Sequence, residues 1–239
     1  MKKLFLSLIT FITVAAVAQD KTVVVDGNAT KRTLTESFTG ISVSDGIDLY
    51  LSQGGEESVA VSASDEKYME RFKTEVENGV LKIYFDNKGI KWATNDKRKL
   101  KAWVSFKTLE KLHASGGADV KIEGEITADN LDIKFSSGSA LNGKLKASSL
   151  TVEQNSGSGI NISGSANKIS VEVSSGAVFK GYDLAVDYCD AKASSGGGIR
   201  LTINKELSAK ANSGGGVRYK GTAVIKEVDV NSGGIVKKA

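Results

Sequence analysis

Apolar and polar residues alternate through the second half of the chain, in segments that each end at a Ser-Gly pair. In one segment, Leu131, Ile133 and Phe135 are separated by Asp132 and Lys134. An alternation with a period of two predicts a strand that buries one face. Most later segments place aliphatic residues at the same three distances from their glycine, so the pattern predicts a series of similar half-buried strands.

The Ser-Gly pair recurs at a nearly constant interval of about 19 residues. Its serines are Ser115, Ser137, Ser156, Ser175, Ser195, Ser213 and Ser232. Repeats of this length stack as parallel coils, with glycine at each corner taking a positive φ. The sequence therefore predicts an all-β fold, a parallel β-solenoid (β-helix) with 19-residue rungs. We expect it to be right-handed, because the left-handed class uses a strict six-residue period, and to hold two or three short strands in each repeat.

The first half of the chain has a different rhythm. Residues 41–49 resemble an isolated earlier copy of the corner, and Asn78-Gly79 predicts a two-residue hairpin. Residues 65–72 predict one or two helical turns. Strands are expected around residues 59–63, 81–85 and 102–106. A terminal rung must not present a bare edge, so we expect this β-rich half to cap the solenoid.

The beginning of the chain has the features of a signal peptide. Two lysines precede an apolar run, Leu4 to Val17, which ends in small residues. The run is shorter than the roughly 20 residues of a membrane span, and no later stretch matches it. We expect export to the periplasm, the outer surface or the medium, with no transmembrane segment in the mature chain. The expected divisions are a signal peptide at 1–18, a lead-in at 19–35, the cap at 36–110 and the solenoid at 111–239.

Three motifs occur in order along the chain, at residues 38–51, 75–83 and 109–120. Together with the later Ser-Ser-Gly repeats, they resemble the head GIN domain family of putative auto-transporter adhesins, envelope or secreted proteins of Bacteroidetes-type bacteria. The resemblance covers roughly residues 36–235. It implies one continuous GIN-type domain with a β-helix-like fold and an extracytoplasmic location, and it supplies no catalytic residue.

Composition narrows the classes of function. The 32 Lys and Arg residues, less the two lysines of the signal peptide, nearly balance 28 Asp and Glu residues. This balance gives no support for a nucleic acid partner, which requires clustered cations. The single cysteine, Cys189, cannot form an intramolecular disulfide and occupies an inward-facing position. We expect it to be a small buried apolar residue.

The candidate catalytic groups each have a structural explanation. His113 lies two residues from Ser115, but side chains two apart on a strand point the same way without meeting. Asp183, Asp187 and Asp190 could form a carboxylate cluster, yet their positions predict solvated surface. The corners lack the Asp spacing of calcium-binding repeats and the Lys-Ser/Thr ending of a phosphate loop. We therefore predict no catalytic residue, no metal site and no cofactor.

One polar column remains as a candidate binding site. It precedes the serine of each corner and is predicted to point outward: Ser136, Asn155, Ser174, Ser194, Asn212 and Asn231. A polar ridge that repeats every 4.8 Å or so could match a regular polymer such as a glycan, or it could simply reflect the preference of turns for Ser and Asn. The exposed aromatic candidates, Trp92, Tyr182 and Tyr219, form no visible row.

These observations favour a non-enzymatic, extracytoplasmic β-solenoid that acts in surface interaction, adhesion or envelope structure. The expected partner is a glycan or another cell-surface or envelope protein. One alternative is a carbohydrate-active enzyme on a β-helix, which requires a cleft with two convergent carboxylates. A periplasmic sensor or scaffold protein is another alternative.

Overall fold

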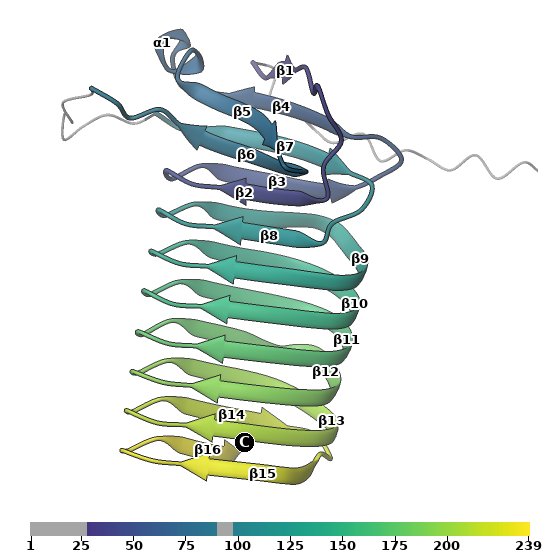
Figure 1. Cartoon of the computed structure of the whole chain (residues 1–239), viewed down its shortest axis with the longest axis vertical. Coiled ribbons are helices and arrows are strands. Elements are labelled where there is room, and N and C mark those ends of the chain that lie inside the picture. Colours follow the sequence, from purple (N-terminus) through teal and green to yellow (C-terminus); the bar gives the residue numbers. More distant parts are fainter. Residues whose placement is uncertain (1–27, 90–97) are drawn as a thin grey trace, which may run out of the picture.

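The computed structural model describes residues 28–89 and 98–239. The predicted signal peptide, the first part of the lead-in and Trp92 lie outside the described residues. The described chain is a β-solenoid of about seven turns whose parallel coils are about 19 residues apart (Figure 1). The nearer strands in Figure 1 run to the left while the chain descends, so the coil is right-handed. The predicted fold class is confirmed.

The elements of the N-terminal half are short. They are β1 (Thr30–Arg32), β2 (Gly40–Val43), β3 (Asp48–Gln53), β4 (Ser58–Ser62), α1 (Glu66–Met69), β5 (Phe72–Glu77), β6 (Val80–Phe85), β7 (Lys101–Phe106) and β8 (Lys111–Ala114). The solenoid continues with β9 (Asp119–Phe135), β10 (Ala140–Gln154), β11 (Gly159–Val173), β12 (Val178–Ala193), β13 (Gly198–Ala211), β14 (Gly216–Lys220), β15 (Val224–Val230) and β16 (Ile235–Lys238).

Each central coil contains one long strand, so the prediction of two or three short strands per repeat is wrong. The strand β10 pairs with β11 from Ala140, opposite Gly159, to Gln154, opposite Val173. The backbone ladder continues around the corner opposite the Ser-Gly turns, because hydrogen bonds to the neighbouring coils hold the chain extended through the bend. At that corner Gly164 has φ 113°, and a Cβ there would lie 2.0 Å from the carbonyl oxygen of Leu145.

The Ser-Gly corner is a tight turn in which both central residues are left-handed. Ser137 has φ 52° and Gly138 φ 74°, as in a type I′ turn. The prediction assigned positive φ to the glycine alone, and the serine shares it. The N–H of Ser139 donates to the carbonyl of Ser136 at 3.1 Å, and the N–H of Gly138 donates to the carbonyl of Ser156 in the next coil at 3.0 Å. Backbone groups therefore link the corners to one another.

In the first corner of the continuous repeat, the turn lies one residue later than the Ser-Gly pair indicates. Gly116 and Gly117 hold the two left-handed positions there, with φ 58° and 77°. Ser115 consequently matches Ser136, the residue before the turn, and not Ser137. A still earlier corner has Asp45 and Gly46 in the same conformation, which confirms the isolated copy expected within residues 41–49.

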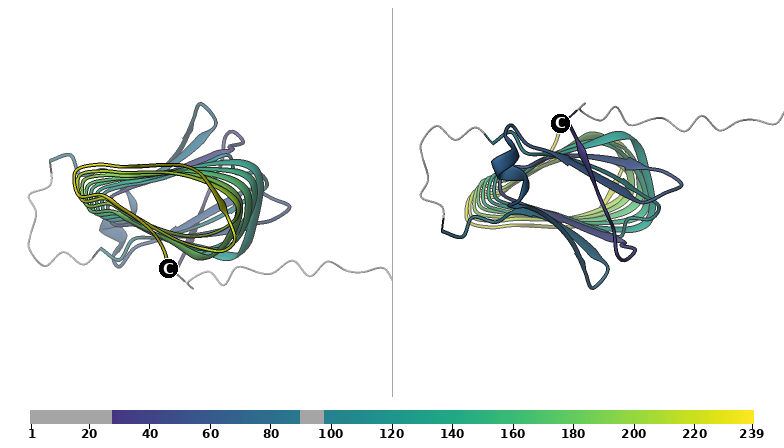
Figure 2. Two further views of the ribbon diagram at one scale, coloured as in Figure 1. Left: turned by 90° about the horizontal axis from the view of Figure 1, so that it is seen from below. Right: turned by 90° about the horizontal axis from the view of Figure 1, so that it is seen from above.

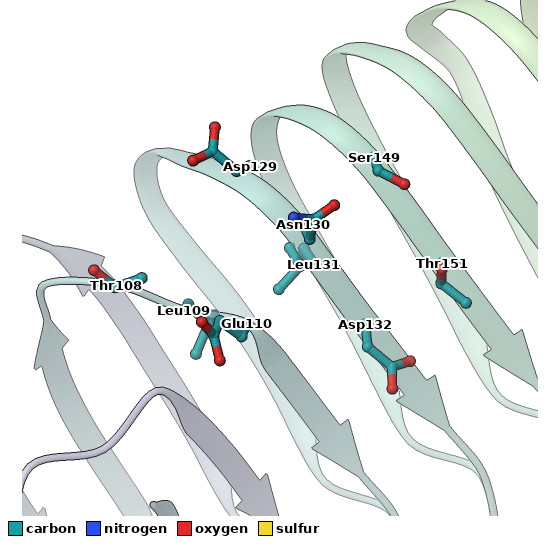
Figure 3. Close-up of a pocket in the computed structure, with 9 residues that line it drawn as sticks. All are labelled: Thr108, Leu109, Glu110, Asp129, Asn130, Leu131, Asp132, Ser149 and Thr151. Carbon is teal, nitrogen blue, oxygen red and sulfur yellow. The ribbon is translucent and has the colours of Figure 1, made fainter.

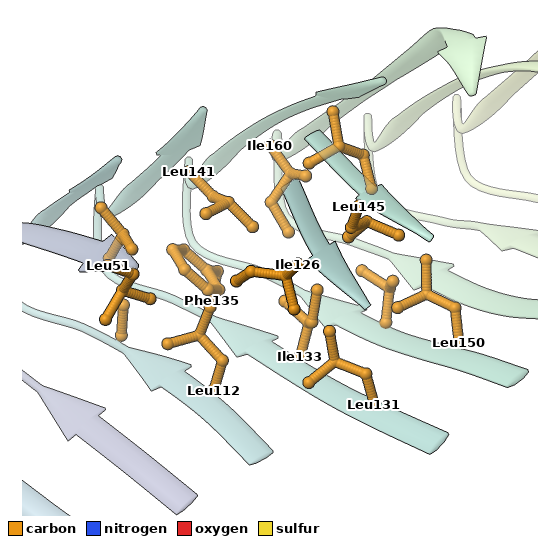
Figure 4. Packing of buried hydrophobic residues seen from close by; sticks show 14 of the residues in the cluster. Leu51, Leu112, Ile126, Leu131, Ile133, Phe135, Leu141, Leu145, Leu150 and Ile160 are labelled. Carbon is orange, nitrogen blue, oxygen red and sulfur yellow. The ribbon is translucent and has the colours of Figure 1, made fainter. Parts of the chain in front are cut away.

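Stacked columns of apolar side chains fill the interior (Figure 4). Leu131, Ile133 and Phe135 of β9 are at most 2% exposed, and Leu141 and Leu150 of the next coil are fully buried. Burying one such side chain contributes about 1.5–3 kcal/mol, so each coil adds several contributions of this size. The inward face predicted from the alternation is thus the core of the solenoid.

The N-terminal end is closed by segments inserted after the first coil. The strands β2 and β3 form a coil that pairs in parallel with β8 and β9 below it. Above it, β6 and β7 pair in parallel with β2 and β3. Two antiparallel strands, β5 beside β6 and β4 beside β7, then end the parallel stack. The predicted cap is confirmed, and it includes the expected hairpin at Asn78-Gly79, where φ is 52° and 72°.

The short helix α1 lies over this end of the solenoid, as seen from above in Figure 2. Asp65 caps it, because its carboxylate accepts a hydrogen bond from the N–H of Lys67 at 3.1 Å. Tyr68 is the buried residue of the helix and packs edge-on against Phe85 at 6.2 Å between ring centroids. The helix therefore covers the interior at its N-terminal end.

Among the described residues, nothing covers the last coil in this way. The side chains of Ile225, Val228 and Val230 continue the inward columns, yet they are 41–45% exposed. Their strand, β15, pairs with the coil above it through β13. The two ends of the solenoid thus differ in how far their apolar side chains are buried.

Beside the Ser-Gly turn at Gly196, one of two adjacent glycines has no room for a side chain. A Cβ at Gly197 would lie 2.4 Å from the carbonyl oxygen of Val173, whereas a Cβ at Gly198 would meet nothing within 4 Å. We expect Gly197→Ala to lower the free energy of unfolding by about 1–3 kcal/mol, as overpacking does. Gly198→Ala is the matched control and should have a negligible effect. Urea denaturation measures both, and equal midpoints for the two variants would contradict this account of the corner.

Candidate functional site

The polar column predicted from the sequence forms a continuous line beside the Ser-Gly corners. We call it the corner ridge; its members are Ser44, Ser115, Ser136, Asn155, Ser174, Ser194, Asn212 and Asn231. The first two members were not predicted, because the turn after Ser44 is Asp45-Gly46 and not Ser-Gly, and because the turn after Ser115 is shifted by one residue. Side chains of the predicted members are half-buried or exposed. The ridge follows the corner at the left edge of the solenoid in Figure 1.

The corner ridge uses its backbone for folding but largely leaves its side chains available. The N–H of Ser174 donates to the carbonyl of Gln154 at 2.9 Å, and its own carbonyl accepts from Ala177 at 3.1 Å. The Asn231 amide donates to Asp229 at 2.6 Å. In the part of the chain that the structure describes, five other ridge side chains make no hydrogen bond: Ser136, Asn155, Ser174, Ser194 and Asn212. Turn formation therefore does not require these side chains.

A shallow hollow of about 260 Å³ lies beside the N-terminal part of the ridge. His113 of β8 and Lys134 of β9 are paired neighbours on its floor. The hollow is lined by Ser42, His113, Ala114, Ser115, Lys134, Phe135, Ser136, Glu153 and Asn155. It is the place where the structure brings the single histidine close to three ridge residues.

His113 is not arranged as a catalytic base. Its Nε2 lies 3.8 Å from the carboxylate of Asp132, too far for a hydrogen bond, and among the described residues it has no hydrogen-bond partner. Burial lowers the pKa of His113 below its usual value, and the neighbouring Asp132 opposes that shift only in part. No hydrogen bond joins His113 to Ser115 within the described chain, so the two do not form a nucleophile and base pair.

A hollow of about 420 Å³ contains three carboxylates that do not converge. Figure 3 shows Glu110, Asp129 and Asp132 spread around it and pointing in different directions. The Glu110 carboxylate accepts a hydrogen bond from Thr39 at 3.0 Å. Asp132 lies 3.8 Å from both His113 and Lys134. The arrangement is not that of an acid and a base facing each other across a glycosidic bond.

The acidic residues near residue 187 are also separated. Asp187 forms an ion pair with Lys205 at 2.7 Å. Asp183 and Asp187 line different hollows, the first beside Lys144 and the second beside Lys146. In residues 28–89 and 98–239, no group of three His, Cys, Asp or Glu side chains is placed to hold a metal ion.

Cys189 lies in the inward column, 6% exposed, between Ile169 and Leu207 of the adjacent coils. Burial raises its pKa to about 12, so the group is a neutral thiol at neutral pH. A thiol without thiolate character is not a nucleophile. Its position is that of the small buried apolar residue expected from the sequence.

The face that follows the corner carries a second column, which the sequence patterns did not single out. It begins at Trp103 and Tyr50, whose rings stack with centroids 5.5 Å apart and planes at 12°. It continues down the face through paired positions on successive coils: Lys121, Asn142, Asn161, Lys180, Arg200, Arg218 and Lys237. We call Lys180, Arg200, Arg218 and Lys237 the basic column.

A signal for this column exists in the sequence. Each residue from Tyr50 onward is the fourth after the second left-handed residue of its corner, for example Arg200 after Gly196. The aromatic pair has no such signal, because Trp103 comes from the inserted segment and only strand pairing places it beside Tyr50. Of the other aromatic candidates, Tyr182 lies under the Lys220 ammonium at 4.5 Å.

The lowered pKa of His113 gives a pH dependence of defined sign. The unfolded chain, with a histidine pKa of about 6.5, takes up the proton at higher pH than the folded chain does. The free energy of unfolding should therefore fall between about pH 7.5 and pH 5.5. His113→Gln should reduce this fall, while Ser115→Ala, which keeps the histidine, should leave it unchanged. Urea denaturation at both pH values tests this, and an equal fall in all three proteins would contradict it.

No helix in the described chain is long and apolar enough to cross a membrane. No curated protein matches the sequence. A model of the family described as putative auto-transporter adhesin, head GIN domain, matches residues 37–223.

Solved structures with the same fold come from Bacteroides and Parabacteroides species. A putative adhesin from Bacteroides fragilis has a TM-score of 0.79 at 20% identity, covering 90% of this chain and 98% of that one. A putative adhesin from Parabacteroides merdae has a TM-score of 0.68 at 20% identity, covering 90% and 97%. A putative lipid binding protein from Parabacteroides distasonis has a TM-score of 0.60 at 19% identity, covering 90% and 98%.

Proposed function

Because the chain belongs to the head GIN domain family of putative auto-transporter adhesins, we propose that it is a non-enzymatic protein acting outside the cytoplasm through surface contact. Its role is in adhesion or envelope structure. The partner is a glycan or another cell-surface or envelope protein, and no cofactor takes part.

The observation that carries this proposal is the regular, ion-paired exterior of the solenoid. Cations and acids on adjacent coils meet repeatedly, as in Lys134 with Glu153 at 3.2 Å and Lys210 with Glu227 at 3.1 Å. Each exposed pair adds little to stability, but the backbone ladder keeps all the outward side chains in register. A flat array of this kind suits contact with an extended surface or polymer.

The hollows described above favour a binding role for the outer surface over a catalytic role. A glycosidase needs two carboxylates on opposite sides of the scissile bond, and Glu110, Asp129 and Asp132 diverge around the hollow of about 420 Å³ (Figure 3). The other hollow beside candidate chemistry holds His113 without a hydrogen-bonded nucleophile. These arrangements favour a binding protein over a carbohydrate-active enzyme.

The filled interior also bears on lipid binding, the activity suggested for one structural relative. A site that encloses an acyl chain needs an apolar cavity of several hundred Å³. Here apolar side chains from both sides of each coil meet inside the solenoid, as Phe135 and Leu141 do in Figure 4. This packing favours contact on the outside of the molecule.

The corner ridge is one contact line within this proposal. Its side chains repeat from coil to coil, and five of the six predicted members are not used by the fold, as described above. Hydroxyl and amide groups both donate and accept hydrogen bonds, which suits sugar hydroxyls or the polar groups of a protein partner. The ridge side chains can therefore be changed with little effect on folding.

Binding of the exported chain to whole cells and to a glycan array tests the proposed function. We expect binding, and we expect the variant Asn155→Ala with Ser174→Ala to weaken it by about fivefold for each side chain, since a hydrogen bond contributes about 1 kcal/mol. The matched control, Ser170→Ala with Ser208→Ala, changes outward residues of the same face away from the ridge. A folded protein that binds neither cells nor any glycan would contradict the proposal, and equal effects of the two variants would exclude the ridge.

A further inference from the structure

The basic column departs from the charge pattern of the rest of the solenoid. Lys180, Arg200, Arg218 and Lys237 lie on β12, β13, β14 and β16, each directly beside the next. All four are exposed, and adjacent coils are about 4.8 Å apart. Like charges placed directly opposite each other on neighbouring strands repel. Four cations in a row therefore form the most concentrated line of positive charge that the paired strands present.

These cations lack the partners that other cations of the solenoid have. Lys144 pairs with Glu125 at 2.8 Å, and Lys205 pairs with Asp187 at 2.7 Å. Across the described ranges 28–89 and 98–239, no ion pair, hydrogen bond or aromatic contact involves any member of the basic column. Their charge is thus available to an anion from outside the protein.

A low track runs beside the basic column on the side of the Ser-Gly corner. On the two central coils the outward position there is a glycine, Gly198 or Gly216, where an added Cβ would meet nothing within 4 Å. On the first and last of these coils Val178 and Ile235 hold the same position, so the track is lowest between them. A linear chain could lie on this track along the solenoid axis, with one cation beside it at each coil.

We propose that the basic column binds a linear acidic polysaccharide, whose regularly spaced carboxylate or sulfate groups contact successive cations. This inference rests on the proposed function and names the ligand class for one face. Arginine guanidinium groups bind planar carboxylates with two parallel hydrogen bonds, and lysine contributes a point charge. Repulsion between the stacked cations falls when the anions bind, which favours the bound state.

The upper part of the same column also suits a sugar chain. Asn161 donates a hydrogen bond to Asn142 at 3.3 Å, so two side-chain amides continue the line above Lys180. The Tyr50 and Trp103 stack lies further up. Amides hydrogen-bond to hydroxyl groups. A polymer on the track would pass from charged contacts to neutral polar contacts as it follows the coils.

Single-stranded nucleic acid fits the basic column less well. Proteins that bind it place aromatic side chains beside the charged track so that successive bases can stack. Of the aromatic residues near the basic column, Tyr182 has its ring covered by the Lys220 ammonium at 4.5 Å, and Tyr219 packs against the core. The observations therefore favour an acidic glycan, and nucleic acid becomes an outcome of the test.

Binding to polygalacturonate, with neutral dextran as the uncharged probe, tests the proposal. We expect the exported chain to bind polygalacturonate, and not dextran, with an affinity that falls as salt rises. The quadruple variant Lys180→Gln, Arg200→Gln, Arg218→Gln and Lys237→Gln should lose at least about tenfold in affinity, as expected when several charge contacts are removed. Absence of binding by the unmodified chain would overturn the proposal.

A second quadruple variant, compared with the basic-column variant, separates this site from a general effect of charge. Changing Lys134, Lys144, Lys205 and Lys210 to Gln removes the same charge elsewhere and should reduce the affinity by less than about threefold, because these lysines lie off the track. An equal loss in both quadruple variants would overturn the assignment to the basic column.

Obstruction of the track tests the geometry without changing any charge. Gly198→Gln with Gly216→Gln places two neutral side chains on it, and we expect a loss of affinity of about tenfold, comparable to the loss of central contacts in an interface. Unchanged affinity of this variant would place the ligand off the track and overturn the geometry.

Poly(dT) and phosphatidylglycerol vesicles are the competing probes. Binding of either that is as tight as binding of polygalacturonate, and equally sensitive to the basic-column variant, would overturn the choice of a glycan. Cell attachment that persists in the basic-column variant refutes this site but leaves the proposed function standing. Polygalacturonate binding without attachment to cells supports the site and a glycan partner, and contradicts adhesion to those cells as the role.

Discussion

The hydrogen-bonded stack of left-handed corners is the constraint on which the rest of this protein depends. Each corner closes on itself through one backbone hydrogen bond and reaches the next corner through another, as Gly138 does with Ser156. The two positive φ angles reverse the chain within two residues, so the strands on either side stay in register from coil to coil. Without that register, apolar side chains would not meet inside and polar side chains would not form columns outside.

Because the strands stay in register, residues at equivalent positions of successive repeats form columns on the surface that extend over several coils. The same ladder that aligns Lys134 with Glu153 as an ion pair aligns Arg200 with Arg218 as neighbouring like charges. One column is therefore neutralised within the protein and the other is not. The difference arises from single residues in each repeat, which the fold tolerates because outward side chains contribute little to the core. Binding properties can thus change along a solenoid while its architecture remains the same.

The two ends of the described solenoid differ in how their apolar interior is covered. At the N-terminal end, antiparallel β4 and β5 and the helix α1 interrupt the parallel stack and cover its apolar interior. In the last coil, inward residues such as Val228 and Val230 remain 45% exposed. The capping strands come from an insertion between the first coil and the second, so they do not follow the 19-residue repeat.

The sequence by itself determined the solenoid, its period and the inward face, because alternation and turn chemistry are local properties. It also indicated the outward direction of Ser174 and its counterparts and the buried position of Cys189. Only the tertiary structure decided that one strand runs through each central coil, since that depends on hydrogen bonds between coils. It also decided that Tyr50 meets Trp103 across an insertion, and that Arg200 and Arg218 have no ion-pair partners among the described residues. Both features depend on residues far apart in sequence, and no local pattern specifies them.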